Sequence, residues 1–216
     1  MDLLKEEIMK SNSNELVQNI SKTMFGKTFH HHYHILYDIR TLLGNEKKIY
    51  TEIGTFCGGS ASLMMSHNYE TVLHCIDPLH VISNQYDIVK NNIVRFNKNN
   101  YEVNVYKKFS NDKNFIEELI NSNFTTDILF IDGDHSYNGV INDFNNFEQF
   151  VNKKGYIVFD DYNDYMYSPE VKIAVDDIVK KIDTEKYEVL GTMENIKNSH
   201  DILNLKLLNE FILYKK

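Results

Sequence analysis

Cysteine is scarce in this sequence of 216 residues, which contains only Cys57 and Cys75. Both lie in apparently core segments, so a disulfide scaffold is not expected and a reducing, cytoplasmic location fits. Long apolar runs are also missing, since none approaches the roughly 20 residues of a membrane span. The amino terminus is charged and amphipathic and lacks the apolar stretch and cleavage site of a signal peptide. We therefore expect no membrane partner.

Clustered positive charge is the next absence. The formal net charge is −8, and the adjacent lysine pairs are scattered along the chain. Binding to nucleic acid through its phosphates needs clustered Lys and Arg, so nucleic acid is not expected as a partner. Hydrophobic residues make up 42% of the chain, which is enough for a substantial core, and the length suits one α/β domain.

Strand-like and helix-like segments alternate along most of the chain. The two last strands have no convincing helix between them, which favours a hairpin-like, antiparallel finish. We expect a helix that carries apolar residues from Val140 to Val151 and is closed by Gly155, and a helix that begins with Ser168 as its cap. The expected strands are 49–53, 71–77, 103–106, 128–131, 157–159, 187–190 and 211–214. The pattern predicts a doubly wound, Rossmann-like α/β sheet.

Two of the expected strands stop abruptly at acids: Asp132 and Asp134 after the first, Asp160 and Asp161 after the second. The ligand crevice of an open α/β sheet lies at the carboxyl ends of its strands. Carboxylates about 4 Å apart repel by roughly 4 kcal/mol at an effective dielectric of 20, so such a cluster favours a bound divalent cation. The alternative is that these acids cap helices and turns.

The first glycine-rich turn, from Glu52 to Ser60, follows a strand and opens a helix, as a nucleotide-binding turn does. It is not G-x-G-x-x-G, because Phe56 stands two residues after Gly54, and no lysine follows it as in a phosphate loop. An acid before the glycines attracts positive charge, which fits the sulfonium and ammonium groups of S-adenosylmethionine. Asp77, at the end of the next strand, is placed to bind ribose hydroxyls. The alternative is ordinary polarity at strand ends.

Four motifs in this order, E-I-G-T-F-C-G-G-S, C-I-D-P, F-I-D-G-D-H-S-Y and F-D-D-Y, resemble the class I S-adenosylmethionine-dependent methyltransferases. The similarity covers roughly residues 48–182 and is closest to small metal-dependent O-methyltransferases, including catechol and antibiotic-sugar enzymes. The resemblance implies strand order 3-2-1-4-5-7-6 with the seventh strand antiparallel. Residues 48–216 would form the methyltransferase core, and residues 1–47 would be N-terminal helices that act as a lid, acceptor pocket or oligomer surface.

The resemblance also implies roles for individual residues. It makes Asp132, Asp160 and Asp161 ligands of Mg²⁺ or another divalent cation. Either Asp134 or His135 would be the base near the acceptor hydroxyl, and the sequence leaves both open. The residues implied to contact S-adenosylmethionine are Glu52, Gly54, Phe56, Ser60, Asp77, Ser110, Asn111 and Asp132.

We therefore expect an S-adenosylmethionine-dependent O-methyltransferase that acts on a small hydroxylated acceptor such as a sugar or glycoconjugate. The alternative is a cofactor-binding subunit or scaffold with the same fold and no transfer activity. Compact enzymes of this size commonly form homo-oligomers, and the N-terminal helices are a natural interface. The histidines between His30 and His34 could bind a metal, although such a group is more often a solvated helix start.

Overall fold

The computed structural model describes residues 33–192 and 210–216, together with positions 3, 6, 15–17, 20 and 22–24. Most of residues 1–32, which belong to the segment expected to form N-terminal helices, lie outside the described residues, and so do His30 to His32. The division at residue 47 stays a prediction. The described chain forms two compact units, residues 2–109 and residues 110–216, and each is considered by itself.

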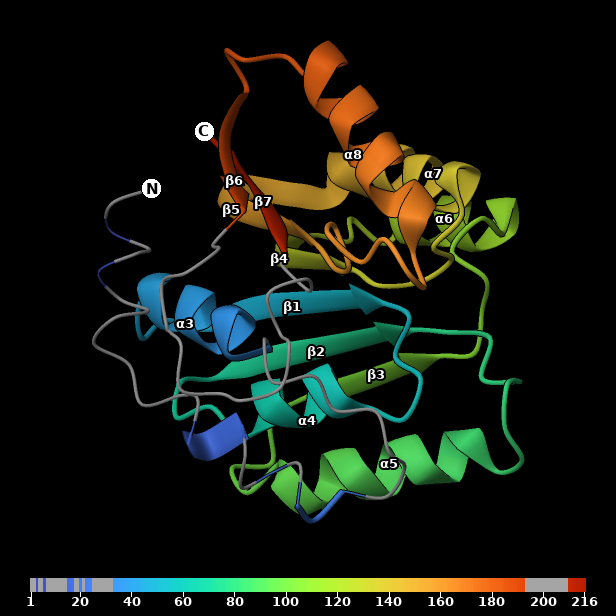
Figure 1. Cartoon of the computed structure of the whole chain (residues 1–216). Helices are drawn as coiled ribbons and strands as arrows, with labels where there is room; N and C mark the ends of the chain where they lie inside the picture. Colours follow the sequence, from blue (N-terminus) through green and yellow to red (C-terminus); the bar gives the residue numbers. More distant parts are fainter. Residues whose placement is uncertain are drawn as a thin grey trace. The chain divides into compact units, whose positions relative to one another are not determined.

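The first unit contains three parallel strands, with α3 before β1 and one helix after each of β1 and β2. Strand β1 pairs with β2 from Lys48 opposite Thr71 to Ile53 opposite Ile76, and β2 pairs with β3. Helix α4 packs against both β2 and α5 (Figure 1). The elements are α3 (His34–Leu42), β1 (Lys48–Ile53), α4 (Gly59–Met65), β2 (Thr71–Ile76), α5 (Gln85–Phe96) and β3 (Val103–Tyr106).

The second unit contains four strands, and α7 packs against α8 and β4 (Figure 1). Strands β4 and β5 are parallel, whereas β7 runs antiparallel to both β5 and β6. The elements are α6 (Lys113–Asn121), β4 (Thr126–Ile131), α7 (Tyr137–Phe147), a 3-10 turn (Glu148–Phe150), β5 (Val151–Phe159), α8 (Pro169–Lys181), β6 (Tyr187–Thr192) and β7 (Phe211–Lys215).

The strand order is β3-β2-β1-β4-β5-β7-β6. This mixed seven-stranded order, with β7 antiparallel to its neighbours, confirms the predicted fold class and topology. Residues 128–131 of β4 and 157–159 of β5 are buried, as expected for strands covered on both faces. Asp112 caps α6, because its carboxylate accepts hydrogen bonds from the Asn114 and Phe115 amides.

The predicted end of the fourth core helix is wrong. Helix α7 ends at Phe147, Val151 already belongs to β5, and Gly155 lies inside that strand instead of closing a helix. A Cβ on Gly155 would lie 2.8 Å from the backbone oxygens of Asn152 and Asp127. This glycine therefore permits close backbone approach within the sheet, which is the other common reason for a strand glycine.

Candidate active site

In the first unit, Glu52 is completely buried near the end of β1. Its Oε2 accepts hydrogen bonds from the Ser60 hydroxyl at 2.6 Å and the Tyr50 hydroxyl at 3.0 Å. Burial raises the pKa of Glu52 to about 7. Two residues predicted to bind the cofactor are thus joined directly, and Glu52 fixes the first turn of α4. Their contact with a cofactor stays a prediction.

Asp77 ties down the glycine-rich turn. Its Oδ2 accepts hydrogen bonds from the backbone amides of Thr55 at 2.9 Å and Phe56 at 2.8 Å, and its Oδ1 accepts from the Leu79 amide at 2.6 Å. Phe56 has φ +45° and Gly54 has φ +88°, which for Phe56 is an uncommon backbone region. Asp77 therefore holds the turn in shape, and its predicted contact with a ribose is not tested.

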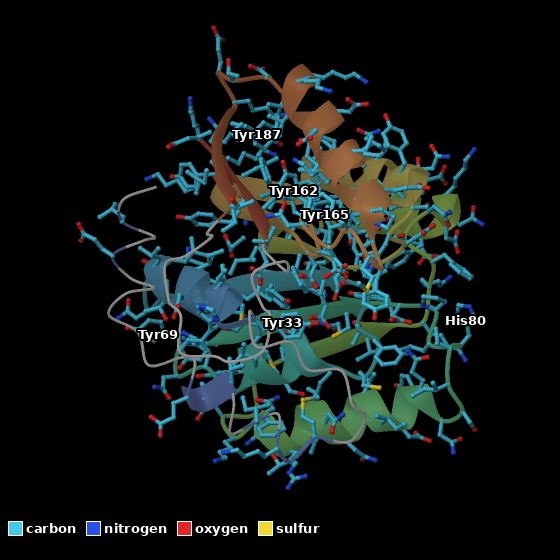
Figure 2. All side chains as sticks on the ribbon, viewed as in Figure 1. Tyr33, Tyr69, His80, Tyr162, Tyr165 and Tyr187 are labelled. Carbon is cyan, nitrogen blue, oxygen red and sulfur yellow. The ribbon has the colours of Figure 1, made fainter. Side chains whose placement is uncertain are left out.

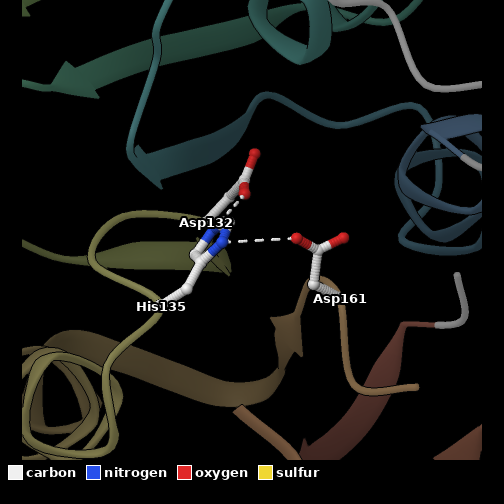
Figure 3. A group of neighbouring side chains, drawn as sticks. All are labelled: Asp132, His135 and Asp161. Atoms are coloured by element: carbon white, nitrogen blue, oxygen red, sulfur yellow. Dashed lines mark hydrogen bonds and ion pairs between the residues drawn. The ribbon is translucent and has the colours of Figure 1, made fainter. Parts of the chain in front are cut away.

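In the second unit, strands β4 and β5 bring an acid-rich group together. His135 Nε2 lies 3.2 Å from Asp132 Oδ1, and His135 Nδ1 lies 3.4 Å from Asp161 Oδ2 (Figure 3). One ligand atom from each residue lies within 4.8 Å of the others. Two carboxylate oxygens and an imidazole nitrogen are ligand atoms that divalent cations bind. Asp132 and Asp161 were predicted as ligands, whereas His135 was predicted only as a base.

Asp161 carries two unusual features. Its φ is +56°, a backbone conformation that costs energy in residues other than glycine. Its Oδ1 is buried and has no hydrogen-bond partner among the described residues. A buried carboxylate oxygen without a partner is costly, and a bound cation would satisfy it. The donor set therefore fits a metal ion.

Asp160 is not one of the three residues that converge. It is buried, and its backbone amide donates to Ile131 O across the pair of strands. Burial, followed by the nearby carboxylates of Asp132 and Asp161, raises its pKa well above the usual range. Asp160 contributes to the electrostatics of the group, and its predicted role as a ligand is untested.

Ser168 is a member of this group that the sequence did not indicate. It precedes α8 as predicted, but its side chain makes no capping hydrogen bond. Its hydroxyl lies 2.8 Å from both Asp161 Oδ2 and His135 Nδ1. The hydroxyl has one hydrogen, so when it donates to the carboxylate it must accept from the imidazole Nδ1–H. In that arrangement His135 Nε2 faces Asp132. This nitrogen then carries either a second proton or a lone pair that a cation can bind.

Glu210 is a further acid that was missed. It is completely buried immediately before β7. Phe211 pairs with Phe159 in antiparallel register, so the continuation of this register sets Glu210 opposite Asp160. Burial and then the charges of Asp160, Asp161 and Asp132 raise the Glu210 pKa well above its usual range. The sequence signal that could have revealed Glu210 is its position just before a strand expected to be antiparallel. The amino end of such a strand lies beside the carboxyl ends of its parallel neighbours.

Asp134 is more exposed than its neighbours in the motif. Its Oδ1 accepts a hydrogen bond from the Ser136 amide at 3.0 Å. It packs against Gly139 in α7, where an added Cβ would lie 2.6 Å from both Cβ and Cγ of Asp134 and still closer to its backbone oxygen. The missing side chain at position 139 therefore leaves room for Asp134, a dependence that the sequence did not reveal.

Ser110, predicted to contact the cofactor, is hydrogen-bonded to a buried acid within its own unit. Its hydroxyl donates to Asp143 Oδ1 at 2.5 Å, and burial raises the Asp143 pKa to about 7. Asn111 is exposed. The predicted contacts of both residues with the cofactor are not tested.

Within the part of the chain that the structure describes, no helix is long and apolar enough to span a membrane.

Comparison with known proteins identifies the family. Residues 51–162 match the family described as "Methyltransferase domain". The chain belongs to this methyltransferase family. A relative from Acanthamoeba polyphaga mimivirus, described only as an uncharacterized protein, is 44% identical over 204 residues, which cover 90% of this chain and 91% of the relative. The matched range contains the glycine-rich turn and both acidic strand ends of this methyltransferase-domain protein.

Solved structures share the fold of this methyltransferase-domain protein. An O-methyltransferase from Bacillus cereus in complex with SAH has a TM-score of 0.60 at 16% identity, covering 95% of this chain and 90% of that one. The O-methyltransferase NovP has a TM-score of 0.60 at 17% identity, covering 100% and 98%. An rRNA methylase from Streptococcus thermophilus has a TM-score of 0.61 at 9% identity, covering 87% and 98%.

Proposed function

We propose that this protein is an S-adenosylmethionine-dependent O-methyltransferase that uses a divalent cation and acts on a hydroxyl of a small molecule such as a sugar or glycoconjugate. The observation that carries the proposal is the convergence of Asp132, His135 and Asp161 after two buried strands of a methyltransferase-family chain. The buried Asp161 oxygen without a hydrogen-bond partner among the described residues supports a cation at this position.

The first unit supplies the features that favour S-adenosylmethionine. Its turn is held by Asp77 and Glu52 and contains no lysine to bind a phosphate. S-adenosylmethionine carries a sulfonium and an ammonium group and no phosphate, so a turn flanked by acids suits it electrostatically. The SAH complex of the Bacillus cereus O-methyltransferase, which shares this fold, supports the same cofactor.

The second unit supplies the features that favour a metal-assisted reaction. Asp132, Asp161 and His135 would hold the cation, and Asp160 and Glu210 would add negative charge around it. Mg²⁺ prefers oxygen ligands in octahedral geometry and keeps open positions for water or substrate. When bound, such a cation lowers the pKa of a hydroxyl that it contacts.

Asp134 is our proposed base. Both ring nitrogens of His135 contact other members of the group, whereas the Asp134 carboxylate is exposed and is held by the Ser136 amide and Gly139. Asp134 would accept the proton of the acceptor hydroxyl, and the remaining contribution of the protein is to hold the two reactants in position.

The charge of the chain favours a small acceptor over a nucleic acid. The net charge is −8, and contacts to nucleic-acid phosphates require clustered Lys and Arg. The fold shared with an rRNA methylase is compatible with either substrate class. We also propose a cytoplasmic location and a homo-oligomer, on the grounds of the two free, buried cysteines and the size of the enzyme.

The test is calorimetric titration of S-adenosylmethionine and of Mg²⁺ into the wild type, Asp161→Asn, Asp160→Asn and the control Glu117→Gln, whose side chain is exposed. We expect cofactor binding in all four proteins and a Mg²⁺ isotherm that Asp161→Asn abolishes and the control retains. Asp160→Asn decides whether that acid is a ligand or a neighbour. Absence of cofactor binding would overturn the proposal, and cofactor binding without methyl transfer would favour a scaffold.

A further inference from the structure

Gln85 joins the glycine-rich turn to the loop between β2 and α5, residues 78–84. It is the first residue of α5 and is only 1% exposed. Its Nε2 donates a hydrogen bond to the Phe56 carbonyl oxygen at 2.9 Å. Its Oε1 accepts from the amide of Val81 at 2.9 Å and from the amide of Ile82 at 3.4 Å. One buried side-chain amide therefore uses its donor on the turn and its acceptor on the loop.

Asp77 links the same two segments. One of its carboxylate oxygens accepts from the Phe56 amide at 2.8 Å, and the other accepts from the Leu79 amide at 2.6 Å. Asp77 and Gln85 thus hold both polar backbone groups of Phe56, its N–H and its carbonyl. Because Phe56 has φ +45°, a conformation that persists only where the surroundings hold it, the shape of the turn depends on both side chains.

The loop depends on these hydrogen bonds because five of its seven side chains, those of residues 80–84, are exposed. His80 lies on the outer side of the loop (Figure 2), and Val81 is 65% exposed. Leu79 has φ +51°, which is uncommon for a residue other than glycine. With little apolar burial to fix the loop, its amides are held mainly by Asp77 and Gln85.

We propose that Gln85 is a positioning residue for S-adenosylmethionine, which sets the glycine-rich turn and the loop 78–84 in one conformation before the cofactor binds. The inference rests on the proposed function for the identity of the cofactor, and Gln85 acts on that cofactor through Phe56. A site that is already ordered loses less conformational entropy when a ligand binds. Without Gln85, the ligand has to order the loop itself, so its affinity falls.

The alternative is that Gln85 only stabilises the start of α5. The two roles differ in what they change. A purely structural residue lowers the unfolding free energy and leaves the affinity of the folded protein for its ligand unaltered. A positioning residue changes that affinity and also changes how fast the loop amides exchange with solvent in the folded protein.

The test uses Gln85→Met, which keeps a side chain of similar length without the amide, and Asn97→Leu as a matched control. Asn97 makes the same kind of two-sided contact with Tyr101, donating to its carbonyl oxygen and accepting from its amide, both at 2.8 Å. It lies about 18 Å away along α5. Three quantities are measured for each protein: S-adenosylhomocysteine affinity by calorimetry, hydrogen exchange of residues 78–84 with and without this ligand, and unfolding free energy in urea.

We expect Gln85→Met to bind S-adenosylhomocysteine roughly tenfold more weakly than the wild type, as the loss of buried hydrogen bonds predicts. Its loop amides should exchange faster than those of the wild type, and the ligand should restore part of their protection. Asn97→Leu should be less stable than the wild type but should keep its affinity and its loop exchange. Wild-type affinity in Gln85→Met, or wild-type exchange of its loop, would overturn the inference.

The wild type supplies a second test that needs no variant. Its loop amides should be protected already in the absence of ligand and should change little when S-adenosylhomocysteine binds. Rapid exchange that becomes slow only with the ligand would contradict an ordered loop and with it the role of Gln85.

The same samples separate this inference from the proposed function. Absence of S-adenosylhomocysteine binding in the wild type would contradict the proposed function and, with it, the assignment of Gln85 to this cofactor. Tight binding that is equal in the wild type and Gln85→Met would contradict only the positioning role. The exchange rates of the ligand-free proteins decide, independently of any cofactor, whether Gln85 holds the loop.

Discussion

The Ser168 hydroxyl donates to Asp161 Oδ2 at 2.8 Å instead of capping the helix that it precedes. This contact connects the start of α8 to the acid-rich group and orients the carboxylate whose other oxygen is buried without a hydrogen-bond partner in the described chain. In a metal site, such hydrogen bonds to a ligand orient it and set its basicity.

Replacing this serine tests whether it orients a metal ligand. Ser168→Ala should weaken Mg²⁺ or Mn²⁺ binding roughly tenfold, because partners of this kind typically contribute 10- to 100-fold in metal affinity. Calorimetric titration measures the change. Ser122→Ala, whose hydroxyl donates to Leu119 O in α6, serves as the control and should leave metal affinity unaltered. Equal metal affinity in both variants and the wild type would refute the positioning role.

Gly139 should resist a substitution that normally stabilises helices. Gly→Ala within a helix usually gains about 0.5–1 kcal/mol. Here the new methyl group would meet the backbone oxygen, Cβ and Cγ of Asp134, so Gly139→Ala should cost about 1–3 kcal/mol in unfolding free energy as overpacked sites do. It should also slow methyl transfer, because the proposed base moves. Urea unfolding measures the change in unfolding free energy, and a turnover assay measures the rate of methyl transfer. A stabilised, fully active variant would contradict the prediction.

Arg40 should be essential to the stability of the first unit. Its guanidinium is fully buried and donates to the Thr71 hydroxyl at 2.8 Å and to three backbone carbonyl oxygens at 2.7–2.9 Å. Arg40→Lys cannot reproduce this fork of donors, so several buried acceptors would lose their partners. We expect a loss of roughly 3 kcal/mol or more in urea unfolding. The exposed control Lys113→Ala should change stability by less than about 0.5 kcal/mol. An Arg40→Lys protein as stable as wild type would show that the lysine replaces these bonds.

Asp143 should make the stability of the protein fall as pH rises. Burial raises its folded pKa to about 7, above the roughly 3.9 of an unfolded aspartate. The folded state therefore keeps a proton that the unfolded state loses, so this contribution is full below about pH 4 and disappears as pH rises towards 7.

The measurement is unfolding free energy across that pH range for the wild type and Asp143→Asn. The variant should lack up to about 1.4 kcal/mol per pH unit of downward slope. Glu52, whose pKa is also raised to about 7 by burial, affects both proteins equally and cancels in the difference. Parallel curves for the two proteins would mean that Asp143 is ionised throughout.

The sequence by itself determined the strands, their order along the chain and the positions where two of them end in acids. These features are local, since a buried strand reads as a continuous apolar run and stops where the chain becomes polar. The cap of α6 is local too, since Asp112 accepts hydrogen bonds from amides two and three residues further along the chain. The motifs also identified the methyltransferase family, because they lie in fixed order at strand ends.

Tertiary structure alone decided which side chains meet. Glu210 joins the acids of β4 and β5 only because β7 is antiparallel, and Ser168 reaches Asp161 only because the intervening turn folds back through Asp164. Gly155 was predicted to end a helix, since sequence cannot distinguish a glycine that ends a helix from one that makes room for a neighbouring backbone. Contacts between residues far apart in sequence depend on register and direction, which no local pattern encodes.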